Sequence, residues 1–272
     1  MSRVSSIDLN ADLGEGFGPW RMGEDEALLD VLTSANVACG FHAGDATIMA
    51  GTARMAKVRG VDIGAHVGYP DLQGFGRRAM VIEPAQLADL VVYQLGALAA
   101  IARVAGHRMT HMSFHGALGN KVAADDDLAD RLVAAVASFD ASLIVSTSPS
   151  SAIESAAARH GLRMARTFLA DRACDEKGLL IPRGMPGAVI DDPDLVLARV
   201  RQLLNDGSVT TYGGAAIKMS VQSILLHGDT PRALQLAQQV RSEIEAGGTQ
   251  LLPLSRATFK TPTPMGDTDA VR

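Results

Sequence analysis

The sequence predicts an α/β protein folded as a single closed β/α barrel. Three observations lead to this fold class: strand-like and helix-like segments alternate along nearly the whole chain, no long linker separates them, and no internal repeat divides them. Repeated β-then-α units imply parallel strands joined by right-handed crossovers. About seven or eight such units fit a closed barrel better than an open sheet. Periodicity alone leaves an open, doubly wound sheet as the alternative.

The composition is that of a globular protein. Of the 272 residues, 47% are hydrophobic and 20% are charged, which is enough apolar material for a full core. The net charge of −5, without a basic stripe, argues against a nucleic-acid partner. The N-terminus lacks the apolar segment of a secretory signal, and no apolar run approaches the ~20 residues needed to cross a bilayer. Cys39 and Cys174 stand far apart, so we expect reduced, buried thiols in a cytoplasmic protein.

The predicted strands are short apolar runs bounded by polar residues or glycine. In the first strand Asp8, Asn10 and Asp12 share one face, because successive side chains of a strand point to opposite sides. The same rule aligns His111, Ser113 and His115 in the fourth strand. The predicted strands cover residues 4–13, 35–39, 61–66, 109–114, 142–146, 163–170, 223–229 and 249–254.

The predicted helices follow these strands in turn. The segment 84–104 is the clearest, because Pro84 suits a first turn and apolar residues such as Leu87, Val91 and Leu98 recur on one face. The predicted helices cover residues 24–32, 47–58, 84–104, 126–138, 152–160, 193–204 and 231–245. We therefore predict a barrel domain over 1–252. Residues 253–272, rich in Pro, Thr and charge, are expected to form an extension that is mobile or packs on a neighbour.

Unusual polar residues gather where the predicted strands end. The strand ends read DLNADLGEG, CGFHAGD, GAHVGYPD, SFHGALGN, FLADR and LLHGD. Four of the seven histidines fall at separate strand ends: His42, His66, His115 and His227. In β/α folds the functional residues lie at the C-terminal ends of the strands, so these side chains are expected to meet at one rim.

Each of these residues also has an ordinary structural explanation. Asp45 and Asp71 taken singly could be turn residues or helix N-caps, and His227 with Asp229 could form a simple turn. The joint pattern favours function, because burying acids and histidines together without a purpose is costly. We therefore predict a functional pocket at the rim.

The residue types at the rim suit two kinds of chemistry. Converging Asp and His groups can hold a metal or perform general acid–base catalysis. The sequence contains no HExxH, GxSxG or Walker-type phosphate loop, and GEGFG lacks the spacing of a dinucleotide site. Arg77, Arg78 and Arg172 could each meet a carboxylate or a phosphate. The pattern thus favours a hydrolase or transferase that acts on a small polar molecule.

The motifs together resemble those of the LamB/YcsF family. IDLNADLGEGFG, SANVACGFHAGD, GAHVGYPD, GFGRRAM, HGALGN, ADR and LLHGD occur in the family's order between about residues 7 and 252. The resemblance implies a distorted, seven-stranded TIM-like barrel of the glycoside hydrolase and deacetylase type. It also implies ATP-dependent opening of the lactam of 5-oxoproline to glutamate, together with two other 5-oxoprolinase subunits. ATP would then be handled with these partners, which would explain the missing nucleotide motif.

The resemblance carries functional residues over to matching positions of this chain. The implied catalytic residues are Asp12, Glu15, His42, His66 and His115. If a divalent metal is bound, the expected ligands are Asp12, His42, His66 and His115. The implied substrate-binding residues are Asp8, Asn10, Asp45, Asp71, Arg77, Arg78, Asn120, Asp171, Arg172, His227 and Asp229.

The chain departs from the family's pattern at a few positions. Ser113 stands where a lysine is expected, Gly119 where a tyrosine is expected, and Val67 replaces a proline. Losing the lysine removes a cation from a site lined with acids, which would raise neighbouring carboxylate pKa values or vacate room for another ligand. The substrate could thus be another lactam, amide or acyl compound.

Three functions remain open from the sequence. The first is the 5-oxoprolinase role, with Asp12 or Glu15 as general base and histidines that orient or stabilise the developing oxyanion. The second is a metal-dependent deacetylase or amidohydrolase. The third is a binding protein without turnover. The sequence leaves open whether the chain forms a homo-oligomer.

Overall fold

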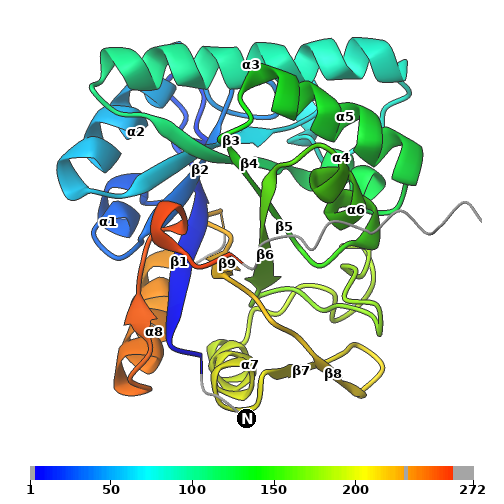
Figure 1. Cartoon of the computed structure of the whole chain (residues 1–272). Helices are drawn as coiled ribbons and strands as arrows, with labels where there is room; N and C mark the ends of the chain where they lie inside the picture. Colours follow the sequence, from blue (N-terminus) through cyan, green and yellow to red (C-terminus); the bar gives the residue numbers. More distant parts are fainter. Residues whose placement is uncertain (1–3, 230–231, 260–272) are drawn as a thin grey trace, which may run out of the picture.

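Seven parallel strands close into a barrel in the computed structural model, which describes residues 4–229 and 232–259 (Figure 1). The strand order is β1-β2-β3-β4-β5-β6-β9, and β9 pairs again with β1. This closure confirms the predicted seven-stranded barrel and rules out the open sheet. The barrel strands are β1 (Ser6–Leu13), β2 (Ser34–Ala38), β3 (Asp62–Val67), β4 (Met109–Phe114), β5 (Ile144–Thr147), β6 (Arg163–Leu169) and β9 (Ser223–Leu226).

Helices surround the barrel on its outside (Figure 1). Every predicted helix is present, with ends shifted by a few residues, although Pro231, the predicted start of the last one, lies outside the described residues. The helices are α1 (Asp25–Leu29), α2 (Ala46–Arg59), α3 (Pro84–Val104), α4 (Gly116–Ala123), α5 (Asp126–Phe139), α6 (Ser151–Arg159), α7 (Pro193–Asp206) and α8 (Ala233–Ala246).

The structure contains elements that the sequence pattern did not predict. Helix α4 follows β4 directly, and a small antiparallel hairpin, β7 (Ser208–Thr210) with β8 (Ala216–Lys218), lies outside the barrel. The 3-10 turn η1 (Leu72–Gly74) follows β3. These elements are short, so they offer too few residues for a periodicity to show.

The inside of the barrel is polar. Along β1 the apolar residues alternate with Asp8, Asn10 and Asp12, and all of them are buried. Hydrogen bonds join polar side chains of neighbouring strands across the interior: Ser223 Oγ donates to Asp8, Asn36 Nδ2 donates to Asp12, and Ser146 pairs with Thr167. Because buried polar groups are costly without partners, this network fixes the side chains below the rim in one arrangement.

The segment that follows α8 packs at the opposite end of the barrel. Strand β10 (Gln250–Leu251) pairs with the start of β1, and the 3-10 turn η2 (Leu254–Arg256) lies next to it in the chain. Leu254 is fully buried against Ile144 and Ala165, and its backbone N–H donates to Ser34 Oγ. The first residues of the predicted extension therefore pack on the barrel; residues 260–272 lie outside the described residues.

Among the described residues, helix α3 alone is long and apolar enough to cross a membrane: it has 21 residues, and an 18-residue stretch of it has a mean hydropathy of 1.6, although the sequence pattern suggested no such run. Its apolar residues Leu87, Val91 and Leu98 are buried, and it contacts α5, α2 and β3. One face of α3 is thus a core face of the barrel.

Candidate active site

A pocket of about 340 Å³ opens at the C-terminal ends of the barrel strands. Side chains of three kinds line it. Asp12, His66, His115 and His227 form its acid and histidine part. Hydroxyl groups come from the ends of β4, β5 and β6, and the cations are Arg77, Arg172 and Arg183. A polar pocket of this size at this end of a β/α barrel is the expected place for a small-molecule site.

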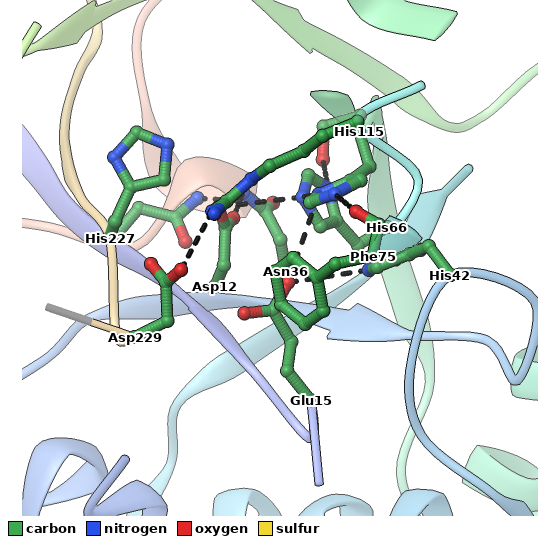
Figure 2. A network of polar contacts seen from close by, with 12 residues as sticks. Asp12, Glu15, Asn36, His42, His66, Phe75, His115, His227 and Asp229 are labelled. Carbon is green, nitrogen blue, oxygen red and sulfur yellow. Dashed lines mark hydrogen bonds and ion pairs between the residues drawn. The ribbon is translucent and has the colours of Figure 1, made fainter. Parts of the chain in front are cut away.

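Four side chains beside this pocket form a tight cluster, the Glu15–His cluster, made of Glu15, His42, His66 and His115 (Figure 2). One ligand-type atom from each lies within 4.8 Å of the others, and all four residues are buried. Glu15 Oε1 is 3.3 Å from His42 Nε2 and 3.7 Å from His115 Nδ1. The imidazoles of His42 and His115 stack with centroids 3.8 Å apart.

The loops after β1 and β2 bring Glu15 and His42 together by packing on each other. Gly44 N–H donates to Gly16 O, and Gly44 has a left-handed φ of +78°. A Cβ on Gly44 would lie 2.8 Å from Gly14 O, so the close approach of these loops requires a glycine here. The glycines of CGFHAGD thus serve to place His42.

Asp12, at the end of β1, connects the Glu15–His cluster to the polar interior. Its Oδ1 accepts a hydrogen bond from Asn36 Nδ2 at 2.9 Å, and its Oδ2 lies 3.4 Å from His66 Nε2. Asn36 Oδ1 in turn lies 3.1 Å from His111 Nε2. Asp12 is held from below by these contacts and faces the pocket with its other side (Figure 2).

Hydrogen bonds fix the orientation of His115 and His66. His115 Nε2 donates to the carbonyl oxygen of Phe75 at 2.8 Å, which leaves Nδ1 as the acceptor, 2.9 Å from His66 Nε2. His66 Nδ1 lies 2.7 Å from Ser113 Oγ. Ser113 therefore supports His66 at the position where the family resemblance leads one to expect a lysine.

Different neighbours give two buried carboxyl groups opposed pKa shifts. Desolvation, followed by the charges of Asp12 and Asp229, raises the pKa of Glu15 well above its usual range. Desolvation also acts on Asp12, but the charge and hydrogen bond of His66 outweigh it, so the pKa of Asp12 is lowered. Two neighbouring carboxyls with opposed pKa shifts are typical of an acid and a base in one site.

Burial also keeps two of the imidazoles neutral. Desolvation, followed by the charge of His66, lowers the pKa of His115 to about 3. Desolvation, with His115 and His66 as neighbours, lowers the pKa of His42 well below its usual range. Neutral imidazoles can donate a hydrogen bond from one nitrogen and accept or ligate through the other.

A second pair of acid–base contacts lies on the other side of Asp12 (Figure 2). His227 Nδ1 lies 2.8 Å from Asp171 Oδ2, and Arg77 Nη2 donates to Asp229 Oδ2 at 2.7 Å. Burial alone would lower the pKa of His227. The charge of Asp171 and its hydrogen bond outweigh the effect of burial, so the pKa of His227 is raised overall. His227 is thus the histidine of the pocket that Asp171 favours in its charged form.

The remaining predicted site residues are placed less centrally. Asp45 caps α2 and accepts from Thr47 N and Ile48 N, as its structural explanation requires, while Asp71 pairs with Arg78 beside η1. Asp8 lies deeper in the barrel, where its carboxylate accepts from Thr33 and Ser223. Asn10 donates to Asn36, and Asn120 lines the pocket.

Some pocket residues were not predicted from the sequence. Asn36 shares a strand face with Ser34, so the alternation in SANVA could have indicated it. Ser146, Thr167 and Arg183 also line the pocket. Arg183 lies in an irregular segment between β6 and α7, where no periodicity marks its direction.

The Glu15–His cluster has the donor set of a metal site. One carboxylate oxygen and three imidazole nitrogens are ligands that zinc and similar divalent ions take, usually four at a time. The hydrogen bonds of His115 to Phe75 O and of His66 to Ser113 are the outer contacts that such ligands commonly make. The ligand set expected from the sequence contained Asp12; the structure places Glu15 with the three histidines and Asp12 beside them.

Comparisons with known proteins agree with one another. A profile of the LamB/YcsF family matches residues 7–259. The chain is 63% identical to 5-oxoprolinase A-subunit 1 of Pseudomonas syringae pv. tomato over 92% of this chain and 98% of that protein. It is 59% identical to 5-oxoprolinase A-subunit 2 of Ralstonia nicotianae over 92% of this chain and 96% of that one. Among solved structures, a lactam utilization protein from Thermus thermophilus is 36% identical, with a TM-score of 0.85 over 91% of this chain and 99% of that chain.

Proposed function

The chain belongs to the LamB/YcsF family, and we propose that it is one component of a cytoplasmic, ATP-dependent 5-oxoprolinase that hydrolyses the lactam of 5-oxoproline to glutamate. The observation that carries the proposal is the polar pocket, in which an ionised Asp12 and buried histidines lie together, in a chain 63% identical to a protein named for this activity. Lactam hydrolysis adds water across the C–N bond, so it needs a base for the water and a proton for the nitrogen.

The residues of the pocket can supply both. Asp12 keeps a lowered pKa and faces the pocket, so it is the proposed base that takes a proton from water. His66, 3.4 Å from Asp12 and 2.9 Å from His115, orients that carboxylate and connects it to His115. Glu15, with its raised pKa and its position 3.7 Å from His115, is the proposed proton reserve for the departing nitrogen.

We also propose that Glu15, His42, His66 and His115 hold a divalent metal. When bound, the ion would act as a Lewis acid toward the amide oxygen and favour the ionised form of Glu15. The donor set supports this assignment, since four buried ligand atoms lie within 4.8 Å of one another. In that state Glu15 is a ligand without a proton to give, so the proton that Asp12 takes from water is the one that reaches the departing nitrogen, and Asp12 keeps its role as base outside the ligand set.

The ATP requirement and the partners follow from the resemblance. The chain has no Walker-type loop. Relatives that match it over nearly their whole length are named as the A subunit of 5-oxoprolinase, which supports an assembly with other subunits. We propose that this chain and two partner proteins bind ATP together, and that the complex they form hydrolyses the lactam.

The test is release of ADP and glutamate from 5-oxoproline plus ATP by this chain mixed with the candidate partner proteins of its genome. Turnover should require the chain and should fall at least ~100-fold in Asp12→Asn, because the amide cannot take a proton as a base. Turnover that persists without the chain, or an Asp12→Asn variant as active as the wild type, would contradict the proposal.

The Glu15–His cluster favours a second candidate, a metal-dependent amidohydrolase or deacetylase that needs neither ATP nor partners. This function predicts hydrolysis of an acylated sugar or amide by the isolated chain, lost on chelation and restored by a divalent ion. Absence of such turnover from metal-loaded protein, with activity in the ATP-dependent mixture, decides for the first function. Binding of 5-oxoproline that depends on Asp12, without turnover in any mixture, would instead indicate a binding protein.

A further inference from the structure

Two arginines in the pocket stand apart from the acids that surround the Glu15–His cluster. Arg172 and Arg183 line the pocket and come from the irregular segment between β6 and α7. In the described ranges 4–229 and 232–259, neither guanidinium has a carboxylate within ion-pair distance, whereas Arg77 is paired with Asp229. Both cations therefore lack a direct ion-pair partner among the described residues, and Asp171, Asp229 and Asp12 act on them only from beyond that distance.

Arg172 is held rigidly in this position. It is 5% exposed, its Nε donates to Ala188 O at 3.1 Å, and its Nη2 donates to Ile181 O at 2.7 Å. Arg199 supports the same segment from behind, donating to Arg172 O at 2.9 Å. The carbonyl groups satisfy hydrogen-bond donors of Arg172, and its positive charge is offset only in part, by Asp171 outside ion-pair distance.

The charges of this region repel one another. Burial, followed by the charge of Arg183, lowers the pKa of Arg172 to about 10. Burial, followed by Arg77, lowers the pKa of Arg183. The charges of Asp171, Asp229 and Asp12 offset this repulsion only in part, since the pKa of Arg183 is still lowered, so a further anion beside Arg183 would be favourable. The arrangement therefore favours a ligand with a negative group.

We propose that Arg183, with Arg172 behind it, binds the carboxylate of the substrate, while the amide lies against Asp12, His66 and His115. The inference rests on the proposed hydrolysis of a cyclic amide and adds the residue that selects for an acidic one. Arg183 has no acid to hold its planar fork, so it can take a carboxylate in a bidentate pair. The hydroxyls of Thr147 and Ser148 line the same pocket and can donate to the same oxygens.

The test compares binding of matched ligands to the isolated full chain by calorimetry. The first pair is 5-oxoproline and 2-pyrrolidinone, which is the same lactam without the carboxylate. The second pair is acyclic: N-acetylglycine and N-methylacetamide, which is the same amide without the carboxylate. Inorganic phosphate is the fifth ligand. The variants are Arg183→Met and Arg183→Lys. The control is Arg201→Met, which removes an exposed arginine of α7 paired with Glu243.

We expect Arg183→Met to weaken 5-oxoproline about 10- to 100-fold and to leave 2-pyrrolidinone unchanged, because only the carboxylate loses its partner. Arg183→Lys should recover part of the loss, and Arg201→Met should match the wild type. In the active mixture, Arg183→Met should raise KM with little change in kcat.

Several results would overturn the inference. The first two concern Arg183→Met: it weakens both lactams equally, or it leaves the binding of 5-oxoproline unchanged. The third is that the wild type binds neither 5-oxoproline nor N-acetylglycine. The fourth is that phosphate binds more tightly than 5-oxoproline and its binding depends on Arg183. The last result would assign the arginines to a phosphoryl group. If no lactam binds but N-acetylglycine binds through Arg183, the lactam function fails and the carboxylate site stands.

Discussion

At the scale of single residues, the pocket depends on acids whose surroundings differ. Asp12 has His66 and Asn36 against its oxygens, while Glu15 has buried imidazoles and three nearby carboxylates. The same side-chain chemistry is thus driven to an ionised state at one position and to a neutral state at the other. A cation among the imidazoles would reverse the state of Glu15 alone, which makes Glu15 the residue most sensitive to metal.

Metal content tests this sensitivity. We expect protein purified without chelator to hold about one divalent ion per chain, and His42→Ala or Glu15→Gln to lose at least ~10-fold in metal affinity through the missing ligand. Elemental analysis after dialysis at set metal concentrations measures this. His160→Ala, which changes a half-buried histidine paired with Asp130 far from the cluster, is the matched control. Wild-type protein without any divalent ion, and turnover indifferent to chelation, would refute the site.

Asp8 gives a second prediction, on stability. Desolvation in the barrel interior raises the pKa of Asp8 to about 7, from 3.8 in the unfolded chain. Between these values the folded state keeps a proton that the unfolded state loses, so the Asp8 contribution to the free energy of unfolding falls as pH rises, by about 1.4 kcal/mol per pH unit.

Denaturant unfolding at pH 4.5 and pH 7.5 measures the effect. Wild type should lose stability relative to Asp8→Asn over this interval, and above pH 7 the difference should stay constant. Asp45→Asn is the control, because Asp45 is an exposed helix cap with a pKa shifted the other way. A difference between wild type and Asp8→Asn that does not change with pH would show that Asp8 is ionised in the folded protein.

At the scale of elements, the turn from β4 into α4 explains one departure from the family's pattern. A Cβ on Gly119 would lie 2.6 Å from the carbonyl oxygen of Phe114, closer than atoms of a folded chain allow. The close approach of the Phe114 carbonyl, just before the pocket residue His115, therefore requires a glycine at position 119. The glycine also leaves the pocket wall beside α4 without a side chain at 119.

Gly119→Ala should therefore destabilise the protein by about 1–3 kcal/mol, since the backbone at Phe114 must move to make room. Gly96→Ala is the matched control, because its Cβ would meet only Phe139 Cε2 at 3.9 Å within α3. That change should be neutral or stabilising by up to ~1 kcal/mol. Urea unfolding measures both, and equal effects of the two substitutions would contradict the packing argument.

The elements also show what the sequence could predict. The alternation of Asp8, Asn10 and Asp12 predicted a polar barrel face because a strand repeats every second residue, and the structure has that face. Helix α4 was missed because GALGNKVA contains two glycines, which are poor helix formers. Arg183 was missed because an irregular segment has no periodicity from which the direction of a side chain could follow. Distances such as that between Glu15 and His115 depend on loop packing, which a strand pattern does not specify.

At the scale of the whole molecule, the pocket lies at one end of the barrel strands, and β10 and η2 pack at the opposite end. That opposite end includes Leu254, which is fully buried and lies outside the predicted barrel domain of 1–252. Its neighbour Ser255 N–H donates to Asp62 Oδ2 at 2.8 Å. We propose that the folded domain extends to this segment.

Leu254→Ala tests that proposal. It should cost about 2–4 kcal/mol of the free energy of unfolding, because it leaves a cavity against Ile144 and Ala165. Leu195→Ala, on the exposed side of α7, is the control and should change stability by less than ~1 kcal/mol. A Leu254→Ala variant as stable as the control would return the boundary to residue 252. Substrate binding should be unchanged in both, since the pocket is at the other end of the strands.

The pairing of β1 with both β9 and β10 has a consequence for synthesis on the ribosome. Asp8–Ala11 pair with Ser223–Leu226, and Ser6 and Ile7 pair with Gln250 and Leu251. The nascent chain therefore presents β1 more than 200 residues before it supplies these partners, which takes roughly tens of seconds at usual rates of translation. During that interval the carboxylates of β1 lie in water. Their negative charge disfavours aggregation, because an acidic strand pairs poorly with a strand of another unfinished chain.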